Sequence, residues 1–216
     1  IWFTLMSSSN ESTLANIGNF VIVLLISSWA IRLGTFLFLR IKKDGEDKRF
    51  RTIKPSASRF FMTWTLQGLW VSLCSMCALT AISSESGIIL NIIFYLGVAI
   101  FILGFAIEII ADNQKSKFRS IEANKDSFIT TGLWAKSRHP NYLGEILLWL
   151  GVAVISFSSL SGWQYLTLIS PIFTYLLLVY VSGVRMLEER GEKKWGHNEE
   201  YIKYKSTTPR LFFNLK

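Results

Sequence analysis

The sequence predicts an all-α protein, a multi-pass transmembrane helical bundle with about five membrane helices. Half of its 216 residues are hydrophobic and only 18% are charged, whereas soluble domains carry about 25% charged residues. Several charge-free stretches reach the roughly 20 residues that a helix needs to cross a bilayer. With 4 Pro, 14 Gly and 2 Cys, the composition excludes collagen-like, disordered and disulfide-rich classes.

The membrane helices follow from where charges are absent. The first charge-free stretch, Ser12–Ile31, continues in apolar pattern to Leu39, and the next two are Phe60–Ser84 and Ser86–Ile107. The last, Ile146–Val184, is too long for one span and is broken near Ser156–Gly162, so it predicts two spans and a tight turn. We expect one transmembrane domain over residues 1–216, with spans at about 16–39, 60–83, 87–110, 142–158 and 165–183.

The basic residues support this count because they gather in alternate connections. Segments 40–59, 111–141 and 184–216 hold 8, 6 and 8 Lys and Arg residues, and the other two connections hold none. These three segments are therefore predicted to be cytosolic. The net charge of +8 then belongs to a surface that faces anionic headgroups or an anionic cofactor, and not to a nucleic-acid interface.

Two smaller features shape the expectations for localisation and metals. The chain begins with Ile and lacks signal-peptide features, so we expect a fragment without its natural N-terminus, in a bacterial inner membrane or endoplasmic reticulum membrane. Cys74 and Cys77 lie within the second span without a second pair. They are interpreted as small core residues, and no metal site is expected.

One candidate cluster lies where the third span reaches the cytosol. Glu108, Asp112, Lys115 and Arg119 follow one another at spacings of 4, 3 and 4, which places them on one helical face. The series is either a solvated helix end with internal ion pairs or one wall of a polar pocket.

The densest constellation is the segment Ser137–Glu145. Pro140 suits the first turn of a helix, so the fourth helix should begin here, directly after Arg138 and His139. A helix N-terminus favours a phosphate or carboxylate, and Asn141 and Glu145 lie one turn apart on one face. A headgroup anchor would explain the two cations but not a Glu inside the membrane.

A third cluster follows the last span, and an amphipathic helix on the membrane surface would look similar. Arg185 and Glu189 can pair at a spacing of four, and Tyr201 and Tyr204 share a helical face. All three clusters lie on the cytosolic side and can surround one cavity. The other members of this cluster are Glu188, Arg190, Trp195, Gly196, Glu200 and Pro209.

These residues carry a resemblance to known membrane enzymes. Arg138–Glu145, a span pair, Glu188-Glu189 and Glu200-Tyr201 resemble the C-terminal half of sterol reductases, steroid 5-alpha-reductases and isoprenylcysteine carboxyl methyltransferases. The stretches Ile107–Asp112, Gly132–Trp134 and Gly144–Gly151 are most similar to the steroid 5-alpha-reductases. The pattern from Arg32-Leu33-Gly34 to Trp70 looks like bacterial and protist members of unassigned function in that superfamily.

The resemblance implies a site for NADPH. In the steroid reductases, the positions that match Asp112, Asn141, Glu145 and Arg185 line the NADPH pocket. Arg119 is a plausible phosphate contact, Tyr142 and Glu145 are the catalytic candidates, and the expected cofactor site also includes Glu108, Arg138, His139, Tyr201 and Tyr204. Glu108 departs from the family pattern, which has Asn there, and the Gln-Glu pair that helps to hold a steroid ketone has no evident match.

The activity implied is reduction of the carbon–carbon double bond of a lipid-soluble enone, steroid-like or isoprenoid-like, by hydride from NADPH. Two alternatives stay open. One is a membrane methyltransferase that uses S-adenosylmethionine, and the other is a non-catalytic membrane protein that binds lipid. The basic residues near the site favour NADPH because S-adenosylmethionine carries no phosphate.

The predicted topology can be tested by cysteine accessibility. Single cysteines placed near Lys48, Asn124 and Lys205 should be labelled from the same side of the membrane, because all three lie in basic connections. Cysteines near Ser84 and Ser161 should be labelled from the other side. Labelling of the Lys48 and Lys205 positions from opposite sides would refute five spans.

Overall fold

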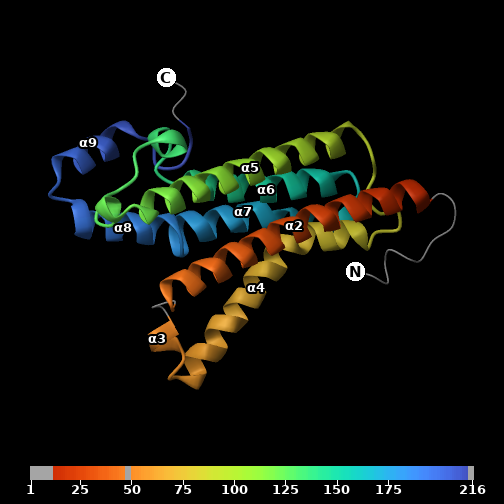
Figure 1. The fold of residues 1–216 in the computed structure, drawn as a ribbon. Coiled ribbons are helices and arrows are strands. Elements are labelled where there is room, and N and C mark those ends of the chain that lie inside the picture. The colour runs from red at the N-terminus through yellow and green to blue at the C-terminus, as the bar shows by residue number, and fades with distance from the viewer. Residues whose placement is uncertain (1–11, 47–49, 214–216) are drawn as a thin grey trace. The chain divides into compact units, whose positions relative to one another are not determined.

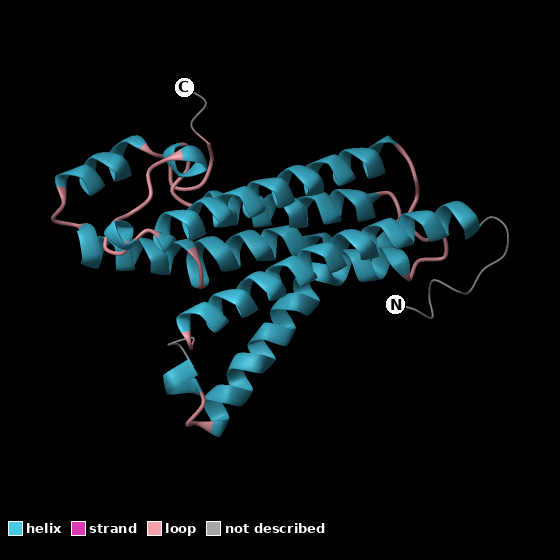
Figure 2. Ribbon diagram, in the orientation of Figure 1, coloured by secondary structure: helices cyan, strands magenta, loops and turns pink. Residues whose placement is uncertain are grey.

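The computed structural model describes residues 12–46 and 50–213, and every regular element in these ranges is helical (Figures 1 and 2). Five segments are long and apolar enough to cross a membrane. The predicted fold class is therefore confirmed. The five segments are Asn16–Lys43, Ala57–Ile82, Ile92–Ser120, Pro140–Phe157 and Gly162–Trp195.

The chain divides into two compact units. The first comprises Ile1–Phe94 and Ile155–Ser170, and the second comprises Tyr95–Val154 and Pro171–Lys216. A single domain over residues 1–216 stays a prediction.

The first unit contains α2 (Ser12–Asp44), α3 (Phe50–Ile53) and α4 (Ala57–Ile82). The Ser56 side chain caps α4 by accepting a hydrogen bond from the Arg59 backbone N–H. Within α4, Cys74 and Cys77 are buried free thiols, and the Ser170 hydroxyl donates to the Cys74 carbonyl. These cysteines pack in the core of this unit, as interpreted from the sequence.

The connection after α4 explains why the next helix starts later than predicted. The backbone N–H of Ile88 donates to Asn19 Oδ1 at 2.9 Å, and that of Ile89 donates to Ser159 Oγ at 3.0 Å. These amides are held by side chains in an irregular segment, so α5 (Ile92–Ser120) begins at residue 92 instead of 87.

The second half of the chain carries the elements that were predicted to be cytosolic. Helix α6 (Pro140–Phe157) begins at Pro140, as the proline predicts. The fifth apolar segment is irregular: a 3₁₀ turn, η3 (Gly162–Leu168), leads into α7 (Ile169–Leu176) and a π turn, η4 (Leu177–Val181). Two polar helices follow, α8 (Val184–Trp195) and α9 (Glu199–Thr207). The 3₁₀ turns η1 (Glu122–Asn124) and η2 (Gly132–Ala135) lie between α5 and α6.

Helices α5 and α6 pack with their backbones in contact through glycines. A Cβ atom on Gly104 would lie 2.5 Å from the Leu148 backbone nitrogen, and one on Gly144 would lie 2.6 Å from the Glu108 nitrogen. Seven residues further along α6, a Cβ on Gly151 would lie 2.6 Å from the Phe101 nitrogen. Small residues allow this approach, which supplies the dispersion contacts that hold helices together in lipid.

Replacing the central glycine should therefore separate the two helices. We expect Gly144→Ala to lower the free energy of unfolding by about 1–3 kcal/mol, the usual range for overpacking. Gly68→Ala on α4 is the matched control, because a Cβ there meets nothing within 4 Å. Equal thermal stability of the two variants in detergent would contradict this account of the interface.

Candidate functional site

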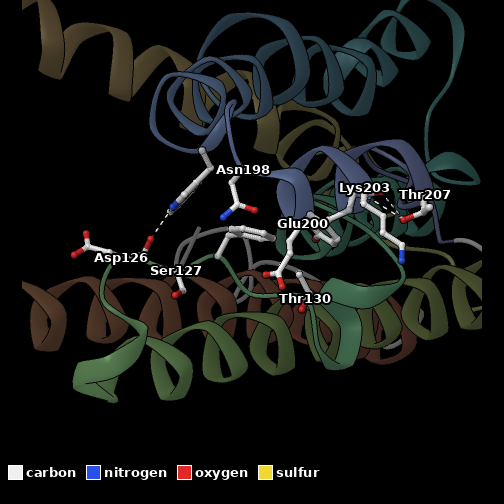
Figure 3. A pocket seen from close by; sticks show the side chains of 10 residues that line it. Asp126, Ser127, Thr130, Asn198, Glu200, Lys203 and Thr207 are labelled. Carbon is white, nitrogen blue, oxygen red and sulfur yellow. Dashed lines mark hydrogen bonds between the residues drawn. The ribbon is translucent and has the colours of Figure 1, made fainter.

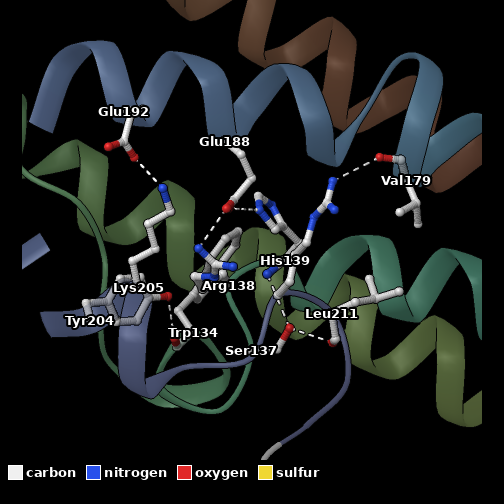
Figure 4. Close-up of polar contacts among 11 residues, drawn as sticks. Trp134, Ser137, Arg138, His139, Val179, Glu188, Glu192, Tyr204, Lys205 and Leu211 are labelled. Atoms are coloured by element: carbon white, nitrogen blue, oxygen red, sulfur yellow. Dashed lines mark hydrogen bonds and ion pairs between the residues drawn. The ribbon is translucent and has the colours of Figure 1, made fainter. Parts of the chain in front are cut away.

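The site is organised around Glu188 on α8. One carboxylate oxygen, Oε1, lies 2.6 Å from His139 Nε2, and the other, Oε2, lies 2.7 Å from Arg138 Nη1 (Figure 4). The three side chains are only 18%, 7% and 12% exposed. Glu188 therefore ties α8 to the residues that immediately precede α6.

The Arg138-His139 segment is also fixed by the C-terminal part of the described chain. The Arg138 backbone N–H donates to the Pro209 carbonyl at 3.0 Å, and the Ser137 hydroxyl donates to the Leu211 carbonyl at 2.6 Å. The same hydroxyl oxygen accepts from the His139 backbone N–H at 3.2 Å. The backbone that precedes α6 is thus held by Glu188 on one side and by hydrogen bonds to Pro209 and Leu211 on the other, without any ligand.

The protonation of His139 follows from its surroundings. Burial lowers the pKa of His139, although the hydrogen bond to Glu188 opposes this shift. In the neutral ring, the proton lies on Nε2, because the Glu188 carboxylate can only accept. Nδ1 is then a buried acceptor, and it has no hydrogen-bond partner among the described residues.

A cavity of about 270 Å³ opens beside this cluster. Its wall contains five basic side chains and one carboxylate, that of Glu188. The opening between α5, α8 and α9 is therefore strongly cationic. The basic residues are Lys115, Arg119, Arg138, Arg190 and Lys194.

Aromatic side chains form another part of this wall. Phe128 lies at the centre of a ring cluster, with centroid distances of 5.0 Å to Tyr201, 5.6 Å to Trp195 and 5.8 Å to Tyr204. The Tyr204 hydroxyl donates to the Trp134 carbonyl at 2.6 Å, and burial raises the pKa of Tyr204. Tyr204 is therefore a fixed neutral donor and not an acid at ordinary pH.

The structure brings together some of the predicted site residues. Arg119, Arg138, His139, Tyr201 and Tyr204 all line the cavity. Its lining does not include the other predicted residues, Glu108, Asp112, Asn141, Tyr142, Glu145 and Arg185.

Those other residues occupy α5, α6 and α8. Glu108 and Asp112 are buried on α5, and Tyr142 and Glu145 are half-buried on α6. Asn141 is half-buried too, and its Oδ1 is a buried atom without a hydrogen-bond partner among the described residues. Arg185 is exposed and pairs with Glu189 at 3.0 Å, as the spacing predicts.

Sequence reasoning did not assign a role to several residues of this wall. Glu188 was part of a noted cluster, but its partners lie about 50 positions earlier in the chain. Arg190 and Lys194 are four positions apart and therefore share a helical face, as Glu108 and Asp112 do, so this spacing could have identified them. Phe128 lies in a short connection without periodicity, so no sequence pattern indicated it. The described residues contain no group of three or more His, Cys, Asp or Glu that could hold a metal ion.

The buried ion pair predicts unequal roles for two neighbouring acids. Removing Glu188 leaves Arg138 and His139 without their carboxylate, so we expect Glu188→Ala to lower the free energy of unfolding by about 3–5 kcal/mol. Glu189→Ala breaks only the exposed pair with Arg185 and should cost less than about 1 kcal/mol. Urea or thermal unfolding in detergent measures the stability of both variants. Equal losses of stability would show that Glu188 does not hold α8 to the start of α6.

Comparison with known proteins gives one result. No curated protein and no solved structure matches the chain. A family model matches residues 1–208, and its description is "Protein of unknown function (DUF1295)". A match over nearly the whole length, on a chain with five segments able to span a membrane, shows that the protein belongs to the DUF1295 family.

Proposed function

We propose that this protein is a membrane oxidoreductase of the steroid 5-alpha-reductase-like group, which reduces a carbon–carbon double bond of a lipid-soluble enone with NADPH. The observation that carries the proposal is the cavity lined by His139 and five cations, Arg138 among them. The sequence resemblance to the steroid reductases covers the same Arg138–Glu145 segment.

The cavity fits the phosphate-bearing part of a dinucleotide. Five cations against one carboxylate suit a ligand with several phosphate charges, because Arg and Lys bind phosphate oxygens by charge-assisted hydrogen bonds. Its volume of about 270 Å³ falls just below the roughly 300–1,000 Å³ of complete small-molecule pockets. It therefore accommodates a portion of NADPH, with the remainder lying outside it.

Two buried acceptors fit the carboxamide of a nicotinamide. His139 Nδ1 and Asn141 Oδ1 have no hydrogen-bond partner among the described residues, and a buried acceptor without a partner costs free energy. An amide N–H₂ is the kind of donor that these atoms lack. We place the nicotinamide end near the start of α6 on this basis.

NADPH supplies the hydride when bound. The hydride goes to the β-carbon of the enone, and a proton goes to the α-carbon, so the double bond becomes a single bond. In the proposal, Tyr142 donates that proton or a hydrogen bond to the carbonyl, and Glu145 orients the nicotinamide carboxamide. Tyr142 packs against buried Leu143, Val179 and Leu211, an apolar setting that suits a lipid-soluble substrate and excludes water.

The binding experiment compares two cations on the same helix. Arg190 lines the cavity and Lys193 does not, and both are exposed on α8. We expect NADPH affinity to fall about tenfold in Arg190→Ala, or about 1.4 kcal/mol, and to stay near wild type in Lys193→Ala. The affinity should also fall as salt rises, because the interaction is between charges.

The result also decides between the candidate enzyme classes. Binding of S-adenosylmethionine without detectable NADPH binding would replace the reductase by a methyltransferase. NADPH binding without turnover of any enone lipid would support the proposed cofactor site and contradict the proposed reaction. Binding of neither cofactor would favour the non-catalytic lipid-binding alternative.

A further inference from the structure

A second cavity, of about 500 Å³, lies in the same unit beside the basic one (Figure 3). Phe128, Trp195 and Tyr204 line both cavities, and so does the exposed Ser127. At Ser127 the two cavities therefore adjoin along a solvent-exposed rim.

The two cavities differ in charge. The residues that line the second include two acids, Asp126 and Glu200, and one cation, Lys203. The border is an ion pair: Lys194 lines the basic cavity, Asp126 lines the second, and their Nζ and Oδ1 atoms are 2.8 Å apart. Phosphates are thus attracted to one side of the border and disfavoured on the other.

The second cavity is lined by aromatic rings and by polar groups. Phe128, Trp195 and Tyr204 supply three rings, and stacking on such rings is favourable for any nucleobase. The Oδ1 atom of Asn198 accepts from the Tyr201 backbone N–H at 3.1 Å. The Asn198 N–H₂ group remains available to donate to a ligand.

The Glu200 carboxylate selects among bases because it only accepts hydrogen bonds. Glu200 lines this cavity together with Thr130, Asp126 and Ser127 (Figure 3). An exocyclic amine satisfies this carboxylate, whereas a ring carbonyl at the same position would repel it. Adenine combines the amine with ring nitrogens that accept from an amide such as that of Asn198.

We propose that the second cavity is a subsite for the adenine ring of a nucleotide whose phosphates lie in the basic cavity. The inference deepens the proposed function, because it assigns the adenosine end of NADPH to a separate place. It does not depend on the reductase reaction, since any adenine nucleotide with a diphosphate presents the same two parts to the two cavities.

The test uses ADP, inosine diphosphate and inorganic pyrophosphate with the full chain in detergent. Inosine diphosphate differs from ADP by a ring carbonyl in place of the exocyclic amine. We expect the wild type to bind ADP about tenfold more tightly than inosine diphosphate, the order of one hydrogen bond to a charged group. Glu200→Gln should abolish this preference and leave pyrophosphate affinity unchanged, because an amide can donate as well as accept.

Glu199→Gln is the matched control. Glu199 precedes Glu200 in the first turn of α9 and lines neither cavity, so this variant should keep the wild-type preference for ADP. Equal binding of the two nucleotides by the wild type, no ADP binding, or an equal loss in both variants would overturn the subsite. Absence of NADPH binding with the ADP preference intact would instead overturn the proposed cofactor and leave the subsite standing.

Discussion

The arrangement of the polar segments at the start of α6 and in α8 depends on the carboxylate of Glu188. Its two oxygens are bonded to Arg138 and His139, and all three groups are largely withdrawn from water. Such a cluster is tolerable only when every charge is paired, because an isolated buried ion costs several kcal/mol. The position of α8 against the start of α6 is therefore tightly specified. Because this ion-pair cluster holds α8 against the start of α6, it also positions the cations and aromatic rings that line the cavity.

The membrane part supplies the other constraint. Within the second unit, α5 and α6 approach until backbone atoms touch at Gly104, Gly144 and Gly151. In lipid, no hydrophobic effect drives helices together, so close packing must do so. The contact fixes α6 along α5, and both helices carry candidate residues: Glu108 and Asp112 on α5, and Asn141 and Glu145 on α6. Helix packing and candidate chemistry are thus linked through the same pair of helices.

The two neighbouring cavities differ in the charge of their lining residues. The basic cavity suits phosphates, and the second, with Asp126, Glu200 and three aromatic residues in its lining, suits a base. The Asp126–Lys194 pair stands at their border. Electrostatic separation of this kind orients a ligand as well as binding it, because reversing the ligand would place each part beside the wrong charge.

The sequence by itself determined the number of membrane helices, the start of α6 and the break after it. Those features depend on local sequence. A long apolar stretch indicates a bilayer crossing, and a proline such as Pro140 is favoured in the first turn of a helix. The sequence also indicated Arg138 and His139 as site residues, since basic residue types before a helix N-terminus are a local pattern. Only the tertiary structure decided that Glu188 binds them and that Phe128 separates two cavities, because a side chain's partner is set by packing between distant segments. Helix periodicity fixes which residues share a face but not what that face meets.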